Sequence, residues 1–416
     1  MKQLKKGLLR QEEIEDSIND SVKKIIHDIK VNGDDALLKY NETFDGMKRK
    51  SLRVTKEEIE ECYQKVDPTF IEMMKRTQQR IEEFAKKQKD CLLPLPLEDE
   101  DIATGHRLVP VDSVLCYIPG GRYPLFSTAL MLITPAKIAG VPRICGTTPP
   151  GKDGLPAITI VAMDVAGADE IYLSGGAQTI GAFTYGTESI DPVNMIVGPG
   201  NAYVAEAKRQ CYGKVGIDFI AGPSEVLILA DDSADPVIVA ADLLAQSEHD
   251  PMAKGILVTT SKDLGKKVLE EVAKQLKDLS TREVAEKSWQ NYGEIYLVDS
   301  WEEGVELSNS IAPEHLEVMF HEEVDLSLLR NYGSLFIGPY SGEVFGDYTS
   351  GPNHTLPTVG ASKYTGGLSV LNFIKVQTMQ KITKKGLQHL IKDTEMMAEG
   401  EGLLAHKNAA TFRNKK

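Results

Sequence analysis

Residues 170–186 read "EIYLSGGAQTIGAFTYG" and join two patterns in one short stretch. "EIYLSG" is an apolar run typical of a buried strand, and "AQTIGAFTYG" then has the composition and the glycine stop of a helix. The same order recurs from residue 111 onward, where strand-like runs such as "RICGTT" and "EVLILA" alternate with helical runs. This alternation predicts an α/β fold, in which parallel sheets are covered by helices on both faces.

The segments on either side of this region have helical patterns. Residues 11–90 carry apolar side chains at helical spacing, with a capping box at Thr55 and Glu58. Residues 372–398 are expected to form one or two helices, followed by a short polar tail. Because 416 residues are too many for one compact core, at least two domains are expected.

The composition excludes several classes of protein. The net charge is −14, and an acidic chain repels phosphate backbones, so nucleic acid is not expected as a partner. No apolar run approaches the roughly 20 residues of a membrane helix, and the N-terminus lacks the apolar core of a signal peptide. A cytoplasmic protein without a membrane partner is therefore expected. The five cysteines are odd in number and form no C-x-x-C pair, which argues against a disulfide framework or a thiolate metal cage.

Three glycine clusters follow consecutive strand-like runs. They are "YIPGGRYP" at 117–124, "SGGAQ" at 174–178 and "GPGNAY" at 198–203. The last has the first two glycines of a dinucleotide fingerprint but Tyr203 in the third place. Each cluster alone is more often a tight strand–helix turn. Three of them at neighbouring strand ends favour a nucleotide crevice.

Two short motifs suggest metal and acid–base chemistry. "DLLAQSEHDP" at 242–251 ends an apolar helix with Gln246 and His249, which are three apart and share a face. "PEHLEV" places Glu314 beside His315 at the start of an expected strand. Histidine and carboxylate groups can bind zinc or exchange protons near neutral pH. At the helix end, a satisfied structural histidine is the more common explanation when the motif is taken alone. For "PEHLEV", a solvated glutamate and a histidine packed under a loop explain the residues about equally well.

Taken in order, the motifs resemble those of the histidinol dehydrogenase family over nearly the whole chain. The resemblance is least distinctive in the first hundred residues. The segments that carry it are "YIPGG", "TPAKIAG", "GGAQ", "GPGNAYVAEAKRQ", "GPSEVLILAD", "DLLAQSEHDP", "APEHLEV", "GDYTSGPNHTLPT" and "AHKNAATFR".

The resemblance implies a role for particular residues at a shared site. The catalytic pair would be Glu314 and His315. Zinc would be held by four residues, which are Gln246, His249, Asp347 and His406. The nicotinamide cofactor NAD would contact Tyr117, Gln178 and Asn201. The substrate would contact Ser224, His354 and Glu401 as well as His315 and the four zinc ligands.

The resemblance also implies a reaction and an architecture. The reaction is oxidation of L-histidinol to L-histidine through L-histidinaldehyde, with two NAD and one water, at the last step of histidine biosynthesis. The fold would have two Rossmann-like, aldehyde-dehydrogenase-like parallel-sheet domains, one inserted in the other, with a helical N-terminal segment and a short C-terminal one. The expected division is a segment at 1–24, a first domain at 25–116 and 226–368, a second at 117–225 and a dimerisation tail at 369–416. Two copies would form an intertwined homodimer with shared active sites.

Three other functions remain open at this point. The first is a zinc- and NAD-dependent dehydrogenase of another small alcohol, such as a sulfonated diol. The second is a zinc hydrolase in which Glu314 activates water and the glycine loops are only turns. The third is a metal-binding scaffold without activity, which the Glu–His pair argues against. Manganese or cobalt could replace zinc in the same set of nitrogen and oxygen donors.

Overall fold

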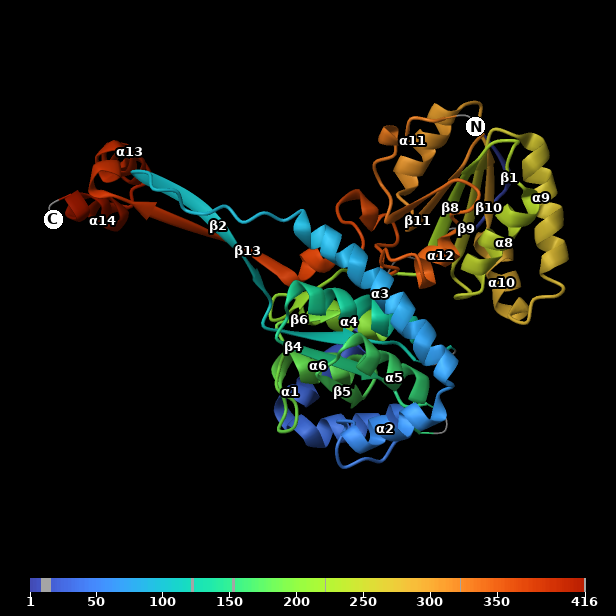
Figure 1. The fold of residues 1–416 in the computed structure, drawn as a ribbon, viewed down its shortest axis with the longest axis horizontal. Coiled ribbons are helices and arrows are strands. Elements are labelled where there is room, and N and C mark those ends of the chain that lie inside the picture. The colour runs from blue at the N-terminus through green and yellow to red at the C-terminus, as the bar shows by residue number, and fades with distance from the viewer. Residues whose placement is uncertain (9–15, 121–122, 152–153, 221, 322, 415–416) are drawn as a thin grey trace.

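The computed structural model describes residues 1–8, 16–120, 123–151, 154–220, 222–321 and 323–414. Two separate lobes each contain one sheet, and a thin arm leads away from them (Figure 1). One sheet has five parallel strands and the other has six, of which five are parallel. The α/β class and the two parallel sheets expected from the alternating pattern are therefore confirmed.

The five-stranded sheet has the order β5-β4-β3-β6-β7. Its strands are β3 (Ser113–Tyr117), β4 (Arg143–Thr148), β5 (Glu170–Leu173), β6 (Met195–Val197) and β7 (Gly216–Ile217). The connecting helices are α4 (Ser127–Ala139), α5 (Ala157–Ala166), α6 (Gly176–Tyr185) and α7 (Ala202–Cys211). The chain starts at the central strand and winds first one way and then the other. This creates a switch point beside β3, where such sheets bind ligands at the carboxyl ends of their strands.

The six-stranded sheet repeats this winding in the order β1-β10-β9-β8-β11-β12. Its parallel strands are β8 (Glu225–Ala230), β9 (Lys254–Thr259), β10 (Glu294–Leu297), β11 (His315–Met319) and β12 (Ser334–Ile337). The helices of this lobe are α8 (Pro236–Ser247), α9 (Lys262–Gln275), α10 (Arg282–Tyr292), α11 (Trp301–Ile311) and α12 (Glu343–Tyr348). Strand β1 (Lys2–Lys5) adds to the edge in the antiparallel direction.

The N-terminal helices belong to the other lobe than expected. They are α1 (Asp16–Asp45), α2 (Lys56–Lys65) and α3 (Pro68–Asp90). Helix α1 packs on α6 and α7, α2 packs on α5, and α3 packs on α4. Ile29 and Leu37 of α1 are buried in one core cluster of the five-stranded lobe, and Met74 and Ile81 of α3 in the other. The expectation that 25–116 shares a domain with 226–368 was therefore wrong for these helices, whose apolar stripes cover the five-stranded sheet.

The arm is a ribbon of two antiparallel strands, β2 (Ile102–Pro110) and β13 (Ile374–Ile382). At its tip lie α13 (Lys384–Gly400) and α14 (Leu404–Asn414), well away from both lobes (Figure 1). The prediction of helix at 372–398 was wrong for β13, and the expected polar tail is largely the helix α14. Both strands of the ribbon are mostly exposed or half-buried, so neither has the apolar run that marks a core strand.

The residues that the structure describes bear on two expectations, which concern membrane helices and disulfide bonds. None of the helices there is long and apolar enough to cross a membrane. All five cysteines are free, and Cys62, Cys116, Cys145 and Cys211 are buried. The cytoplasmic location and the absence of a nucleic-acid partner stay predictions.

Candidate active site

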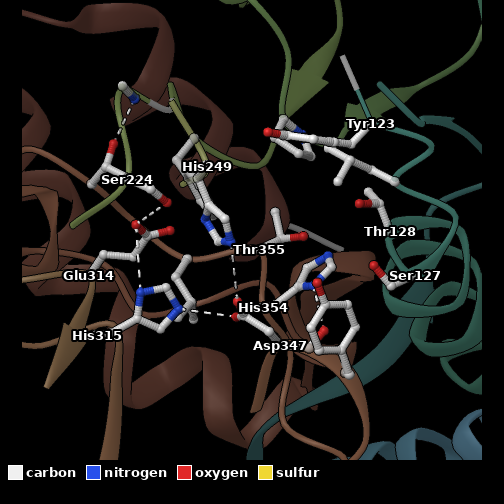
Figure 2. A pocket seen from close by; sticks show the side chains of 17 residues that line it. Tyr123, Ser127, Thr128, Ser224, His249, Glu314, His315, Asp347, His354 and Thr355 are labelled. Carbon is white, nitrogen blue, oxygen red and sulfur yellow. Dashed lines mark hydrogen bonds and ion pairs between the residues drawn. The ribbon is translucent and has the colours of Figure 1, made fainter. Parts of the chain in front are cut away.

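A pocket lies between the two lobes, and both contribute to its wall. Figure 2 shows Tyr123, Ser127 and Thr128 on one side of it, facing side chains from the other lobe. These facing residues are Ser224, His249, Glu314, His315, Asp347, His354 and Thr355. Ser127 follows the carboxyl end of β3, whereas Ser224 and Glu314 precede the amino ends of β8 and β11. The pocket therefore joins the carboxyl edge of one sheet to the amino edge of the other.

A sharp turn before β11 brings Glu314 and His315 to this pocket. Helix α11 ends at Ala312, which has a left-handed backbone with φ of 57°. The hydroxyl of Ser362 donates to the carbonyl oxygens of Ala312 and Pro313 at 2.8 and 3.1 Å and fixes the turn. Neighbouring side chains inside a strand would point to opposite faces. Here both reach the pocket because the strand begins only at His315.

Glu314 is buried but well hydrogen-bonded. Its Oε2 accepts from the Ser224 hydroxyl at 2.6 Å and from the backbone N–H of Glu225 at 3.0 Å. Burial raises the pKa of the carboxyl to about 7, and the nearby His315 and these hydrogen bonds oppose the rise. A carboxyl that titrates near neutral pH is suited to take a proton from water.

His315 lies between backbone and carboxylates. Its Nδ1 is 3.2 Å from the carbonyl oxygen of Glu225, which identifies Nδ1 as the donor, and its Nε2 is 3.3 Å from Asp347 Oδ1. Burial lowers the pKa of the ring, but the negative charges of Glu314, Asp347 and Glu343 outweigh burial and raise it well above the usual value. Burial raises the pKa of Asp347, but the hydrogen bond and charge of His315 bring it down to about 2.

Gln246, His249 and Asp347 gather beside this pair. Gln246 Nε2 lies 3.3 Å from His249 Nδ1, and His249 Nε2 lies 3.9 Å from Asp347 Oδ2. Gln246 is fully buried, yet its Oε1 has no hydrogen-bond partner. A buried carbonyl oxygen without a partner is costly, and a cation facing it would satisfy it. The donor set of amide oxygen, imidazole nitrogen and carboxylate fits zinc.

The other two residues expected at this site lie elsewhere in the chain. Glu401 caps α13 and His406 lies in α14, both exposed at the tip of the arm (Figure 1). Within the ranges that the structure describes, no group of three or more His, Cys, Asp and Glu is placed to hold a metal. Three of the four expected ligands, Gln246, His249 and Asp347, nevertheless lie close to one another in this chain.

The expected substrate contacts Ser224 and His354 both line the pocket. His354 is anchored by its Nδ1, which lies 2.8 Å from the backbone carbonyl oxygen of Asp347. This contact ties the position of His354 to that of the expected metal ligand.

The three expected cofactor contacts lie at the carboxyl edge of the five-stranded sheet. Tyr117 ends β3, and its hydroxyl accepts from the backbone N–H of Gly176 at 3.1 Å. Gln178 in α6 is buried and donates to Asn41 Oδ1 at 3.3 Å, while Asn201 caps α7. All three lie at strand ends where the glycine clusters occur, of which residues 121–122 lie outside the described ranges, and the nucleotide crevice stays a prediction.

Sequence reasoning missed a group of buried carboxyls behind His315. They are Asp242 in α8, Glu317 in β11 and Glu343 in α12. Glu343 Oε2 is 3.7 Å from His315 Nδ1, and Glu317 Oε1 accepts from the backbone N–H of Glu343 at 2.6 Å. Two spacings could have signalled them: Glu317 is two residues after His315 in one strand, and Asp242 is one helical turn before Gln246.

Known proteins resemble the chain over almost its full length. A family model described as histidinol dehydrogenase matches residues 8–414. Proteins called histidinol dehydrogenase from Clostridium acetobutylicum and Methanothermobacter thermautotrophicus are both 45% identical, over 95% and 96% of this chain and 92% and 94% of theirs. The crystal structure of histidinol dehydrogenase from Elizabethkingia anophelis is similar with a TM-score of 0.92 at 38% identity, over 98% of this chain and 94% of that one. Fold, motifs and full-length similarity agree, and the chain belongs to the histidinol dehydrogenase family.

Proposed function

We propose that this protein oxidises L-histidinol to L-histidine through L-histidinaldehyde, with two NAD and one water, as the last step of histidine biosynthesis. The observation that carries the proposal is the arrangement of Glu314 and His315. Both are buried at the pocket that joins the lobes, beside three converging donor groups. The similarity to named histidinol dehydrogenases supports the choice of substrate.

Gln246, His249 and Asp347 would hold a zinc ion, with His406 of a second subunit as the fourth protein ligand. When bound, the metal supplies a Lewis-acidic anchor for the amino and imidazole nitrogens of the substrate. The orphaned Gln246 Oε1 supports this assignment, because a neutral amide oxygen satisfies a cation without adding charge. Ser224, His354 and Glu401 would contact the rest of the substrate.

In its neutral form, His315 would accept the proton of the alcohol as hydride leaves for NAD. A metal ion bound to Asp347 would offset one of the negative charges that raise the pKa of the ring. Nδ1 of His315 is committed to the Glu225 carbonyl, so Nε2 is the nitrogen that can exchange a proton with substrate. Glu314 would then take a proton from the water that adds to the aldehyde, and His315, after releasing its first proton to solvent, would act as base again in the second oxidation. Tyr117, Gln178 and Asn201 would hold NAD, which accepts hydride in both steps.

A shared active site in a homodimer completes the proposal. The tip of the arm exposes several large apolar side chains, which are Met396, Met397, Leu403, Leu404 and Phe412. They lie in or between two helices that pack on each other, and exposed apolar side chains of this size are typical of a surface that associates with another chain. The same tip carries Glu401, which caps α13, and His406, which lies in α14, both away from the two lobes of their own chain (Figure 1).

The test is product stoichiometry with purified protein. L-Histidinol and NAD should give two NADH for each histidine formed, whereas a sulfonated diol offered in a parallel reaction should give none. Turnover of the diol alone would favour the related dehydrogenase. Hydrolysis of an ester or amide substrate, with no NADH formed from L-histidinol, would favour the zinc hydrolase.

A further inference from the structure

A buried ion pair holds the glycine loop that follows β6. Lys208 in α7 and Asp218, which follows β7, have side chains only 3% and 1% exposed. The Lys208 ammonium donates to Asp218 Oδ1 and, at 2.9 Å, to the carbonyl oxygen of Gly198. Asp218 Oδ2 accepts from the backbone N–H of Gly198 at 2.8 Å. One ion pair therefore satisfies both polar backbone groups of a single glycine.

Gly198 needs such a clamp because of its conformation. Its φ is +114°, a region that side chains rarely adopt, and a Cβ at this position would collide with the carbonyl oxygen of Tyr117. The loop it begins continues through Pro199, which lines the pocket, to Asn201, which caps α7. Small changes in the backbone at Gly198 would therefore move both a pocket wall and an expected cofactor contact.

Asp218 extends the connection to a second part of the wall. Among the six residues that follow Asp218, three line the pocket, and they are Phe219, Gly222 and Ser224. Ser224 in turn donates to Glu314. The ion pair thus joins the cofactor loop to the segment that supports the catalytic carboxyl.

Stability alone does not account for a pair of this kind. Replacing a buried ion pair by well-packed apolar side chains is often neutral or stabilising, because two charges lose their hydration on burial. An apolar pair would, however, leave the N–H and C=O of Gly198 without partners. The arrangement therefore favours a role in fixing the shape of the loop.

We propose that Lys208 and Asp218 are positioning residues, which hold the 198–201 loop in the shape that binds the nicotinamide cofactor. This inference rests on the proposed function. The pair touches neither the substrate nor the reacting atoms. Its loss should act on cofactor binding more strongly than on the rate at saturation.

The experiment compares Lys208→Met with a matched control, Arg209→Met, in the full-length, metal-loaded protein. Arg209 is the next residue of α7 and pairs with the fully buried Glu206 at 2.7 Å, but neither residue is bonded to the loop. The dissociation constant of NADH is measured by fluorescence titration, together with KM for NAD, kcat and Tm. Hydrogen exchange of the amides at 195–204 reports the loop directly.

We expect Lys208→Met to weaken NADH binding and raise KM for NAD by roughly tenfold or more, since a charged hydrogen bond to the loop is lost. The decrease in kcat should be smaller, and amides 195–204 should exchange faster. Arg209→Met should bind NADH with an affinity within about twofold of wild type, even if it lowers Tm as much as Lys208→Met does. Asp218→Asn, which is nearly isosteric, should give the same pattern and serves in place of Lys208→Met if that variant does not fold.

Two results would overturn the inference. The first is NADH binding in the loop variants that is no weaker than in Arg209→Met. The second is that kcat and the affinity for NADH decrease by the same factor in every variant, and that this factor follows the decrease in Tm. If the wild-type protein itself fails to bind NADH, the proposed function fails, and the inference that rests on it fails too.

Discussion

Glu314 and His315 are positioned by one backbone residue of the neighbouring strand. Glu225 donates its N–H to the carboxylate of Glu314 and accepts from Nδ1 of His315 with its C=O. This is possible because β8 and β11 are parallel neighbours, with His315 opposite Val226. The register of two core strands thus decides which atoms of the pair remain available for chemistry.

Glu314→Gln should separate the two oxidation steps. The amide can still accept from Ser224 but cannot take a proton from water, so the aldehyde step should slow by about 10²- to 10⁴-fold. His315→Asn should slow both steps, because in the proposed mechanism the same imidazole is the base in each. Single-turnover NADH formation, started from L-histidinol or from L-histidinaldehyde, measures each step. Equal loss of both steps in Glu314→Gln would contradict the role given to the carboxylate.

The buried carboxyls should make the fold less stable as pH rises. Burial and the charge of Asp242 raise the pKa of Glu317 to about 8, and burial raises that of Asp242 to about 6. Between the unfolded pKa values, about 4.3 for Glu and about 3.9 for Asp, and these folded values, the folded protein keeps protons that the unfolded chain has lost. Stability therefore falls through this window, by at most about 1.4 kcal/mol per pH unit for each retained proton.

Glu317→Gln should weaken this dependence on pH. The difference between the urea midpoints at pH 5.5 and pH 8 should be smaller in the variant than in wild type. Glu306→Gln, at an exposed position of α11, should leave the difference as it is. If Glu317→Gln and wild type lose stability equally between these pH values, Glu317 does not retain a proton in the folded state.

At the scale of elements, the sequence predicted the apolar strands and helices of the cores and missed the exposed strand of the arm. Core strands and helices are continuous apolar runs between glycines, so their alternation was visible. The arm strand "IKVQTMQKI" has polar groups on both faces and gave no strand signal. Helices α1 to α3 showed apolar stripes, but a stripe does not indicate which sheet it will cover. Glu343 was missed for a similar reason, since a carboxylate looks solvated until its neighbours from other elements are known.

The attachment of α13 to the arm offers a prediction for one element. Thr383 donates its N–H to the carbonyl oxygen of Asp101 at 2.9 Å, and a Cβ on Gly386 would collide with that same carbonyl. Gly386→Ala should therefore push α13 from the ribbon, at a cost of about 1–3 kcal/mol. Gly400→Ala, in the last residue of the same helix, meets open space and is the matched control.

Hydrogen exchange over residues 384–400 measures the effect. Amides there should exchange faster in Gly386→Ala than in wild type, whereas Gly400→Ala should match wild type or exchange more slowly. Equal protection in both variants would mean that the ribbon yields to the new methyl group without releasing the helix.

At the scale of the whole molecule, we expect folding not to depend on metal binding. Each lobe has its own buried apolar clusters, and the expected ligands lie at the pocket and on the arm rather than inside those cores. Chelation should therefore abolish activity while the helical circular dichroism signal is kept. Removal of metal from a structural cage would instead unfold the chain. Global loss of the signal after chelation would contradict an open catalytic site.

The position of the arm provides a test of the proposed homodimer. Gln246, His249 and Asp347 lie close together, the last two in the pocket wall, but His406 is exposed at the tip of the arm of the same chain. If His406 serves the site of a second subunit, two inactive variants should complement each other. One variant carries Gln246→Ala with His249→Ala, and the other carries His406→Ala.

Neither variant alone should be active, because each homodimer lacks ligands at both sites. A mixed dimer has one site with all four ligands, while its other site lacks Gln246, His249 and His406. Unfolding and refolding the two variants together should restore roughly a quarter of wild-type activity, since about half of randomly formed dimers are mixed and each has one working site of two. Mass spectrometry of the intact dimers verifies the mixture. If mixed dimers form without any recovery of activity, His406 binds no metal across the interface, and the exposed tip of the arm must have another purpose.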